Sequence, residues 1–323
     1  MSTARDDVWA ITTFFNPIGF ENRLTNYRVF RERLNVPLLA VEASFGGEFQ
    51  LTRDDADILV QVKGGDVMWQ KERLLNIGLD RVPGESGAVA WVDCDVLMER
   101  PDWLEQAIAR LDDYVLVQPF HRSFRLPPGV LPEEFDGVSA KPRFPIAYHL
   151  STGALTTEAL REWSLNGDKP NDGLAWVGRR DVMMKHRFYD AQVVGGGTRN
   201  LAHAAVGEHD ALIAGRRVSP RHAEHYLAWA REFYETVQRR VGYVRGTLYH
   251  LWHGDEAHRY GVVRHERFAE FDFDPTTDIA LDEDGCWRWN SDKVEMHAYL
   301  KEFLAARRED GENGPGPTGR PAS

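Results

Sequence analysis

The segment Ala88-Val-Ala-Trp-Val-Asp-Cys-Asp95 joins a run of residues typical of a buried strand to two carboxylates that follow it directly. β-Branched and aromatic residues favour strands, and open α/β sheets bind ligands where their strands end. In an extended segment, residues i and i+2 point to the same side. We therefore expect Asp93 and Asp95 to face one point at the mouth of a sheet, with Cys94 facing the other way.

Strand-like and helix-like stretches alternate around this segment. Strands are predicted over residues 8–15, 36–41, 88–92 and 114–118, and helices over 23–34, 66–79 and 103–111. Such alternation is typical of an α/β protein whose mostly parallel sheet is covered by helices on both faces. Further along, we expect helices over 221–240 and 294–308 and short strands over 271–274 and 286–289, while the proline-rich residues 121–145 predict a substrate-side loop.

The composition limits the classes of function. The 323-residue chain has a formal net charge of −11, which argues against binding to nucleic acid or to an anionic membrane surface. No apolar run approaches the ~20 residues that span a bilayer, and the first residues have no signal-peptide core. Two cysteines exclude a disulfide framework, and we expect a cytoplasmic protein.

The two carboxylates suggest a metal site. Convergent carboxylates repel each other unless a cation lies between them, and oxygen ligands suit Mg²⁺ or Mn²⁺. Such a cation can neutralise a departing diphosphate. Asp-x-Asp occurs four times in the chain, but only Asp93 and Asp95 follow a buried-strand run directly. The alternative is a helix-capping turn before Pro101.

A second candidate segment is Leu248-Tyr-His-Leu-Trp-His-Gly254. A neutral imidazole from His250 or His253 would complete a metal site begun by the aspartates, and the added nitrogen ligand favours Mn²⁺. A histidine in an aromatic stretch is also a common core residue. The following Arg259, Tyr260 and Arg264 suit phosphate oxygens, with plain surface charge as the alternative.

Further polar residues flank the predicted sheet. Lys71, Arg73 and Asn76, on one predicted helix, would reach a nucleotide at the sheet edge unless they form only a solvated helix face. Glu42 ends the second predicted strand and would accept a hydrogen bond from a base or ribose, or simply lie in a loop. The common phosphate-loop, dinucleotide, zinc-protease and serine-hydrolase motifs are absent.

Four segments in order resemble the GT-A-type glycosyltransferases, which carry a DxD metal motif. They are Thr13–Asn16 with Glu72–Asn76, then Trp91–Asp95, then Gly173–Asp181 with Tyr189–Gly197, and finally His250–Gly254 with Arg259 and Tyr260. The resemblance covers roughly residues 8–265 and implies a Rossmann-type, GT-A-like sheet. It also implies a bound nucleoside-diphosphate sugar, most often a UDP-sugar, and transfer of the sugar to an acceptor hydroxyl.

The resemblance also implies roles for particular residues. Asp93 would contact ribose or metal, Asp95 would bind Mn²⁺ or Mg²⁺, and His253 would be a further protein ligand. Inverting members need a carboxylate base, commonly after the glycine run, but here Gly197 is followed by Thr-Arg-Asn. Asp172 and Asp190 are the nearest replacements. A retaining mechanism, which needs no such base, and loss of activity both stay open.

The expected organisation is a single domain over residues 1–308, followed by a disordered Gly/Pro-rich tail over 309–323. Within the domain, residues 8–120 would bind the nucleotide-sugar, 121–265 would bind acceptor and metal, and 266–308 would form C-terminal elements. The rival functions are a catalytically silent sugar-nucleotide-binding protein and a sugar-1-phosphate nucleotidyltransferase. The latter would need a basic Gly-rich loop after the first strand, and Phe15–Phe20 has no basic residue.

Overall fold

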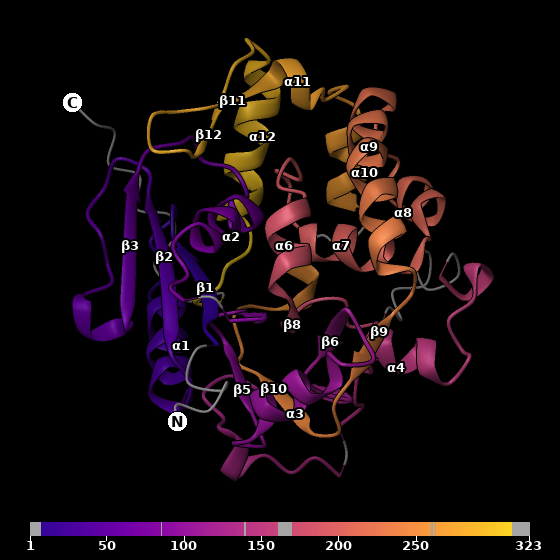
Figure 1. Ribbon diagram of the computed structural model, residues 1–323. Coiled ribbons are helices and arrows are strands. Elements are labelled where there is room, and N and C mark those ends of the chain that lie inside the picture. The colour runs from indigo at the N-terminus through magenta and orange to yellow at the C-terminus, as the bar shows by residue number, and fades with distance from the viewer. Residues whose placement is uncertain are drawn as a thin grey trace.

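The centre of the molecule is a seven-stranded sheet with the strand order β3-β2-β1-β4-β8-β6-β9 (Figure 1). The computed structural model describes residues 8–84, 86–138, 140–160, 170–259, 261 and 263–311. The strands are β1 (Ala10–Phe15), β2 (Leu38–Ser44), β3 (Ile58–Lys63), β4 (Ala88–Val92), β6 (Leu116–Gln118), β8 (Ala175–Arg179) and β9 (Val241–Tyr243). Only β8 pairs antiparallel with its neighbours, so the predicted mostly parallel α/β sheet is confirmed.

Helices cover both faces of the sheet, as the continuous apolar strands predict. Alternate strand residues such as Ile11 and Trp91 pack into a core with α2 (Lys71–Leu79), α6 (Arg180–His186), α7 (Gly197–Val206) and α9 (Pro220–Val237). Their neighbours, such as Ala10 and Ala90, pack on the opposite face with α1 (Glu21–Arg33) and α3 (Trp103–Arg110). Successive residues of a strand therefore point alternately into two cores, one on each face of the sheet.

The strand order reverses between β1 and β4, because β2 and β4 lie on opposite sides of β1. Open α/β sheets bind ligands in the crevice beyond the carboxyl ends of the strands at such a reversal. A second, three-stranded sheet adjoins this point: β5 (Val96–Met98) and β7 (Arg122–Arg125) flank β10 (Thr247–His250). Its strand β5 follows β4 directly, so this sheet positions the segments beside Asp93 and Asp95.

The remaining elements lie mainly at the upper right and top of Figure 1. They are α8 (His209–Arg216), α10 (Val263–Ala269), α11 (Pro275–Asp278), the hairpin β11 (Ile279–Leu281) and β12 (Trp287–Trp289), and α12 (Val294–Ala305), while α4 (Ile146–Ser151) lies below them. The short 3-10 helices are η1 (Arg53–Asp55), η2 (Pro132–Glu134) and η3 (Glu256–Arg259).

Some predicted elements were wrong or displaced. Residues 271–274 form no strand, and the partner of β12 is β11 instead. The predicted helix over 66–79 begins only at Lys71, because Asp66 bonds to the hairpin: its backbone N–H donates to Trp287 O, and its carboxylate accepts from Trp289 N. The predicted loop over 121–145 contains β7, whose pairing with a distant strand is not encoded locally.

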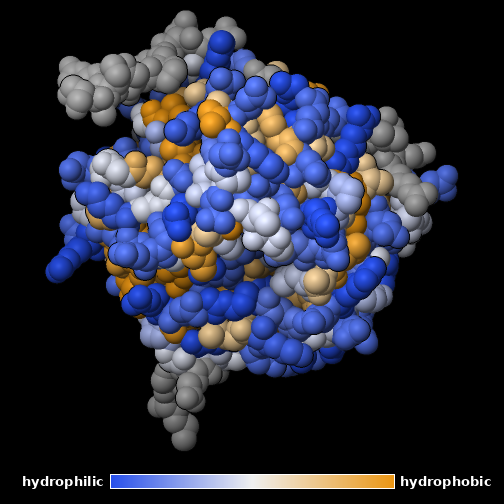
Figure 2. Space-filling model, turned by 90° about the horizontal axis from the view of Figure 1, so that it is seen from above, coloured by the Kyte–Doolittle hydropathy of each residue, from blue (hydrophilic) through white to orange (hydrophobic). Residues whose placement is uncertain are grey.

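The surface seen from above is mostly hydrophilic, with hydrophobic residues in small separate groups (Figure 2). None of the helices in the described part of the chain is both long and apolar enough to cross a membrane. This face therefore offers no large apolar patch that competes with the interior cavity as a candidate site.

Candidate functional site

A cavity of about 630 Å³ opens beyond the carboxyl ends of β1 and β4. Its lining includes nine cationic side chains: Arg23, Lys71, Arg125, Arg143, Arg199, Arg216, Arg259, Arg264 and Arg307. Six carboxylates share the lining: Glu72, Asp93, Asp95, Asp172, Glu256 and Glu309. Cations therefore exceed carboxylates here although the chain as a whole carries −11. A cavity of this charge attracts an anionic ligand.

Asp95, His250 and His253 form a cluster of candidate metal ligands in this cavity. One ligand atom from each lies within 4.8 Å of the others. Asp95 Oδ1 is 3.4 Å from His250 Nε2, Asp95 Oδ2 is 3.6 Å from His253 Nε2, and the two Nε2 atoms are 2.9 Å apart. The predicted ligand His253 thus lies beside Asp95. His250, the other histidine of the same candidate segment, completes the group.

Backbone pairing brings these distant segments together. β10 pairs antiparallel with β5, so His250 lies opposite Val96, and Leu251 N donates to Asp95 O at 2.9 Å. Gly254 ends the histidine segment with φ +88°, and a Cβ there would lie 2.7 Å from Arg307 O. Only glycine adopts this turn at so close an approach without strain.

The chemical states of the cluster suit a divalent cation. Burial alone would raise the pKa of Asp95, but His250 and Arg259 hold it below its ordinary value. Burial, followed by nearby Arg259, lowers the pKa of His253 well below its ordinary value, so the imidazole is neutral. Among the described residues, Asp95 Oδ1 is buried and accepts no hydrogen bond. A carboxylate and a neutral imidazole are the ligand forms of Asp95 and His253.

Asp93 has a different environment from Asp95. Residues 93–95 leave the extended conformation and form a turn between β4 and β5, so the expected alternation of strand faces does not apply and Cys94 also lines the cavity. Asp93 forms an ion pair with Lys71 Nζ, which also lies 3.4 Å from Thr198 Oγ1. The three-residue cluster that could hold a metal does not include Asp93.

The two candidate bases, Asp172 and Asp190, lie in different places relative to the cavity. Asp172 lines the cavity and accepts a hydrogen bond from Arg199 Nε at its Oδ2, while its Oδ1 is buried with no hydrogen-bond partner among the described residues. Asp190 does not line the cavity. It accepts hydrogen bonds from Arg73 Nη1 at 3.0 Å and Asn76 Nδ2 at 2.9 Å, which ties it to α2.

Four further sequence candidates lie away from the cavity or outside the described residues. Arg73 and Asn76 are held by Asp190, as above, and are not among the lining residues. Glu42 is 2% exposed, accepts hydrogen bonds from Gln50 N and Gln61 Nε2, and also does not line the cavity. Tyr260 lies outside the residues that the structure describes.

Arg259 does lie in the cavity, against the metal-ligand cluster. Its Nη2 lies 2.8 Å from His253 Nδ1 and 2.5 Å from His253 Nε2. Burial and neighbouring arginines lower the pKa of Arg259 to about 9. The positive charge of Arg259 is compatible with a neutral His253. The guanidinium also lies within reach of any anion bound at the cluster.

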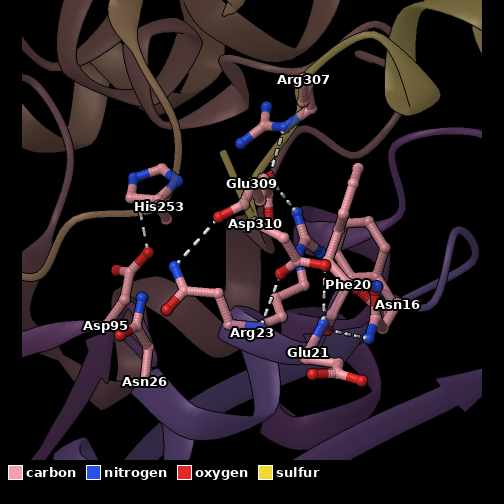
Figure 3. A network of polar contacts seen from close by, with 12 residues as sticks. Asn16, Phe20, Glu21, Arg23, Asn26, Asp95, His253, Arg307, Glu309 and Asp310 are labelled. Atoms are coloured by element: carbon pink, nitrogen blue, oxygen red, sulfur yellow. Dashed lines mark hydrogen bonds and ion pairs between the residues drawn. The ribbon is translucent and has the colours of Figure 1, made fainter. Parts of the chain in front are cut away.

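Glu309 lies in the segment that the sequence predicts to be a disordered tail, so nothing in the sequence indicates it as a site residue. Its side chain is 1% exposed and lines the cavity. Arg23 Nε and Arg307 Nε each donate to its carboxylate at 2.6 Å (Figure 3). The adjacent Asp310 accepts a hydrogen bond from Asn22 N at 2.8 Å at the start of α1. The ordered chain therefore extends past residue 308, while residues 312–323 lie outside the described part.

Glu72 was also missed as a candidate, because it stood in a charged helix. It is 4% exposed and packs against α7, where a Cβ on Gly197 would lie 2.5 Å from Glu72 Oε1. Burial raises the pKa of Glu72 to about 7. The cavity thus contains a carboxyl group that titrates near neutral pH.

The sequence matches no protein-family model and none of the curated protein sequences. Solved structures that align with the chain include glucosyl-3-phosphoglycerate synthase from Mycobacterium tuberculosis in complex with Mn²⁺, UDP and glucosyl-3-phosphoglycerate. That alignment has 12% identity, a TM-score of 0.39, and coverage of 82% of this chain and 77% of that one.

Two more alignments have the same TM-score of 0.39. Mannosyltransferase PcManGT from Pyrobaculum calidifontis, in complex with GDP-Man and Mn²⁺, is 13% identical, with coverage of 93% of this chain and 73% of that one. TarS of S. aureus, residues 1–349, is 11% identical, with coverage of 93% and 71%. At such identities and TM-scores, the function has to be inferred from the side chains of the cavity.

Proposed function

We propose that the protein is a metal-dependent glycosyltransferase that moves a sugar from a nucleoside-diphosphate sugar, with a UDP-sugar as the first donor to test, to an acceptor hydroxyl. The observation that carries this proposal is the cluster of Asp95, His250 and His253 in a cation-rich cavity at the reversal of the sheet. The resemblance in sequence to GT-A-type enzymes supports it independently.

The residues of the cavity divide the work as follows. Asp95, His250 and His253 would hold Mn²⁺ or Mg²⁺, and a cation held there supplies positive charge to the departing diphosphate. Arg259 would leave His253 for a phosphate oxygen, because its Nη2 contacts both ring nitrogens and a nitrogen that binds a cation cannot also accept a hydrogen bond. Asp93 and its partner Lys71 would contact the ribose and the diphosphate.

Asp172 is the base that we propose for an inverting transfer. It is the one of the two predicted candidates that lines the cavity, and its buried Oδ1 accepts no hydrogen bond within the described residues. The bond from Arg199 to Oδ2 fixes the carboxylate so that Oδ1 is available to an acceptor hydroxyl. A base must come within hydrogen-bond reach of the proton it removes.

The test is UDP-sugar turnover by the wild-type protein and by Asp95→Asn in the presence of Mn²⁺. We expect the wild type to hydrolyse a UDP-sugar slowly without an acceptor and Asp95→Asn to lose this activity while its thermal unfolding stays cooperative. Asp113→Asn, which changes an exposed aspartate after α3, is the matched control. Turnover in Asp95→Asn equal to that of the control would refute the proposal, and donor binding without any turnover would favour the catalytically silent alternative.

A further inference from the structure

Three arginines from three different helices meet at the start of α7, and we call them the arginine cluster: Arg199 in α7, Arg216 in α8 and Arg264 in α10. Arg216 and Arg264 approach Gly196, which has φ +84° and precedes the helix that carries Arg199. A Cβ on Gly196 would lie 2.6 Å from Arg216 Nη2 and 3.4 Å from Arg264 Nη2. All three side chains line the cavity.

Two of these guanidinium groups have only uncharged partners among the residues that the structure describes. Arg216 is 7% exposed and donates to Asn200 Oδ1 and to Gly196 O. Arg264 donates to Arg259 O at 3.4 Å and to a ring nitrogen of His265 at 3.3 Å, and its guanidinium packs over Phe303. A buried cation, Arg216, and a half-buried one, Arg264, without a carboxylate partner in the described part of the chain are costly for a folded protein.

Burial and mutual repulsion lower the pKa values of two arginines in the cluster. Burial, then Arg199 and Arg264, lowers the pKa of Arg216 to about 9, and burial, then Arg307 and Arg199, lowers that of Arg264 to about 9. Arg199 is the member with a carboxylate partner, Asp172. Glu72 also lies beside Gly197, but its raised pKa leaves it partly neutral near pH 7. The local charges therefore leave a positive excess.

We propose that the arginine cluster is a subsite for an anionic group, a phosphate or a carboxylate, on the acceptor. This proposal rests on the proposed glycosyltransferase function and names the class of acceptor: a small hydroxy compound that carries a negative charge. Guanidinium groups recognise the oxygens of both anions in paired hydrogen bonds. An anion here would give Arg216 and Arg264 the charged partner that no described residue supplies.

The cluster contacts the proposed base through Arg199, while Arg264 donates to the backbone oxygen of Arg259. Arg199 holds Asp172 Oδ2, so an acceptor whose anionic group binds Arg216 and Arg264 can present a hydroxyl to Asp172 Oδ1. The metal-ligand cluster has a separate cation, Arg259, for the diphosphate. The subsite would thus orient the acceptor through a charge remote from the reacting hydroxyl.

The first experiment uses inorganic phosphate as the probe, in calorimetric titrations with and without saturating UDP and Mn²⁺. We expect phosphate to bind the protein in both conditions. Arg264→Gln should weaken phosphate binding by about tenfold or more while the affinity for UDP with Mn²⁺ stays unchanged. Arg221→Gln, an exposed arginine in α9, is the matched control. Arg264→Lys, which retains the charge, should recover part of the affinity and guards against a variant that fails to fold.

Each outcome decides the proposal. Absence of phosphate binding, or equal binding by Arg264→Gln and the control, would overturn it. Displacement of phosphate by UDP would assign the cluster to the donor diphosphate and would also overturn it. Failure of UDP to bind with Mn²⁺ would instead count against the proposed function, so the two failures are distinguishable. Titrations with glycerol 3-phosphate, glycerate and uncharged glycerol then separate the two anions, and we expect glycerol not to bind.

Discussion

The buried carboxylate of Glu309 provides the sharpest test of how the C-terminal segment is held. Arg23 donates to it through Nε at 2.6 Å and Nη2 at 2.9 Å, and Arg307 through Nε at 2.6 Å. Burial alone would raise the pKa of Glu309, but the two guanidinium groups hold it well below its ordinary value. Glu309→Gln removes the charge, keeps the shape and leaves two cations sharing one amide oxygen.

We expect this substitution to lower the free energy of unfolding by about 3–5 kcal/mol, the cost of removing one partner from a buried ion pair. Urea unfolding at pH 7 measures the loss. Glu302→Gln, an exposed glutamate of α12, should change the free energy by less than about 0.5 kcal/mol. A loss below about 1 kcal/mol in Glu309→Gln would refute the assignment of Glu309 to an ordered, paired site.

The pH dependence gives a second readout of the same contact. Because the folded-state pKa of Glu309 lies below its unfolded value of 4.5, the stabilisation is complete above that pH and is lost as the pH falls below it. The unfolding free energies of the wild type and Glu309→Gln should therefore converge in acid. A difference that stayed constant down to low pH would contradict an ionic origin.

Three further substitutions test other parts of the account. Asp190→Asn should lower the free energy of unfolding by about 1.5–3 kcal/mol, as measured in urea, without lowering the proposed turnover by the folded protein, since Asp190 holds Arg73 outside the cavity. Because the pKa of Glu72 is raised in the folded protein, its neutral form contributes stability that is complete below about pH 4.5 and is lost as the pH rises through about 7. The free energy of unfolding of Glu72→Gln should therefore fall less than that of the wild type over this pH range, by up to about 3 kcal/mol. Gly254→Ala should cost more than about 1 kcal/mol in thermal unfolding, whereas Gly87→Ala, where a Cβ meets nothing within 4 Å, should be nearly neutral.

The part of the fold that local sequence encodes was predictable. The run before Asp93 is apolar on both strand faces, so it indicated a buried strand, and β4 covers the predicted residues 88–92. The strand β1 and the body of the helix α2, though not its start, follow from the same local patterns. These signals also placed Asp95 at a carboxyl end of the sheet, where the cavity lies.

The contacts between distant segments were not predictable in the same way. Nothing near His250 in the chain specifies that β10 pairs with β5, yet that register puts it beside Asp95. The separation of Asp172 from Asp190 likewise depends on which of them packs against α2. Local composition failed most clearly at Glu309, where a Gly/Pro-rich context predicts disorder, whereas the remote Arg23 and the nearby Arg307 hold the chain in place.

The central claim is that Asp95, His250 and His253 hold a divalent cation that faces a nucleoside diphosphate. The most direct measurement is calorimetric titration of UDP into the protein with and without Mn²⁺, and of Mn²⁺ with and without UDP. We expect Mn²⁺ to tighten UDP binding by about 5–150-fold, with UDP tightening Mn²⁺ binding by the same factor, and Asp95→Asn to abolish this coupling. UDP binding that is independent of Mn²⁺, or coupling that survives in Asp95→Asn, would contradict the claim.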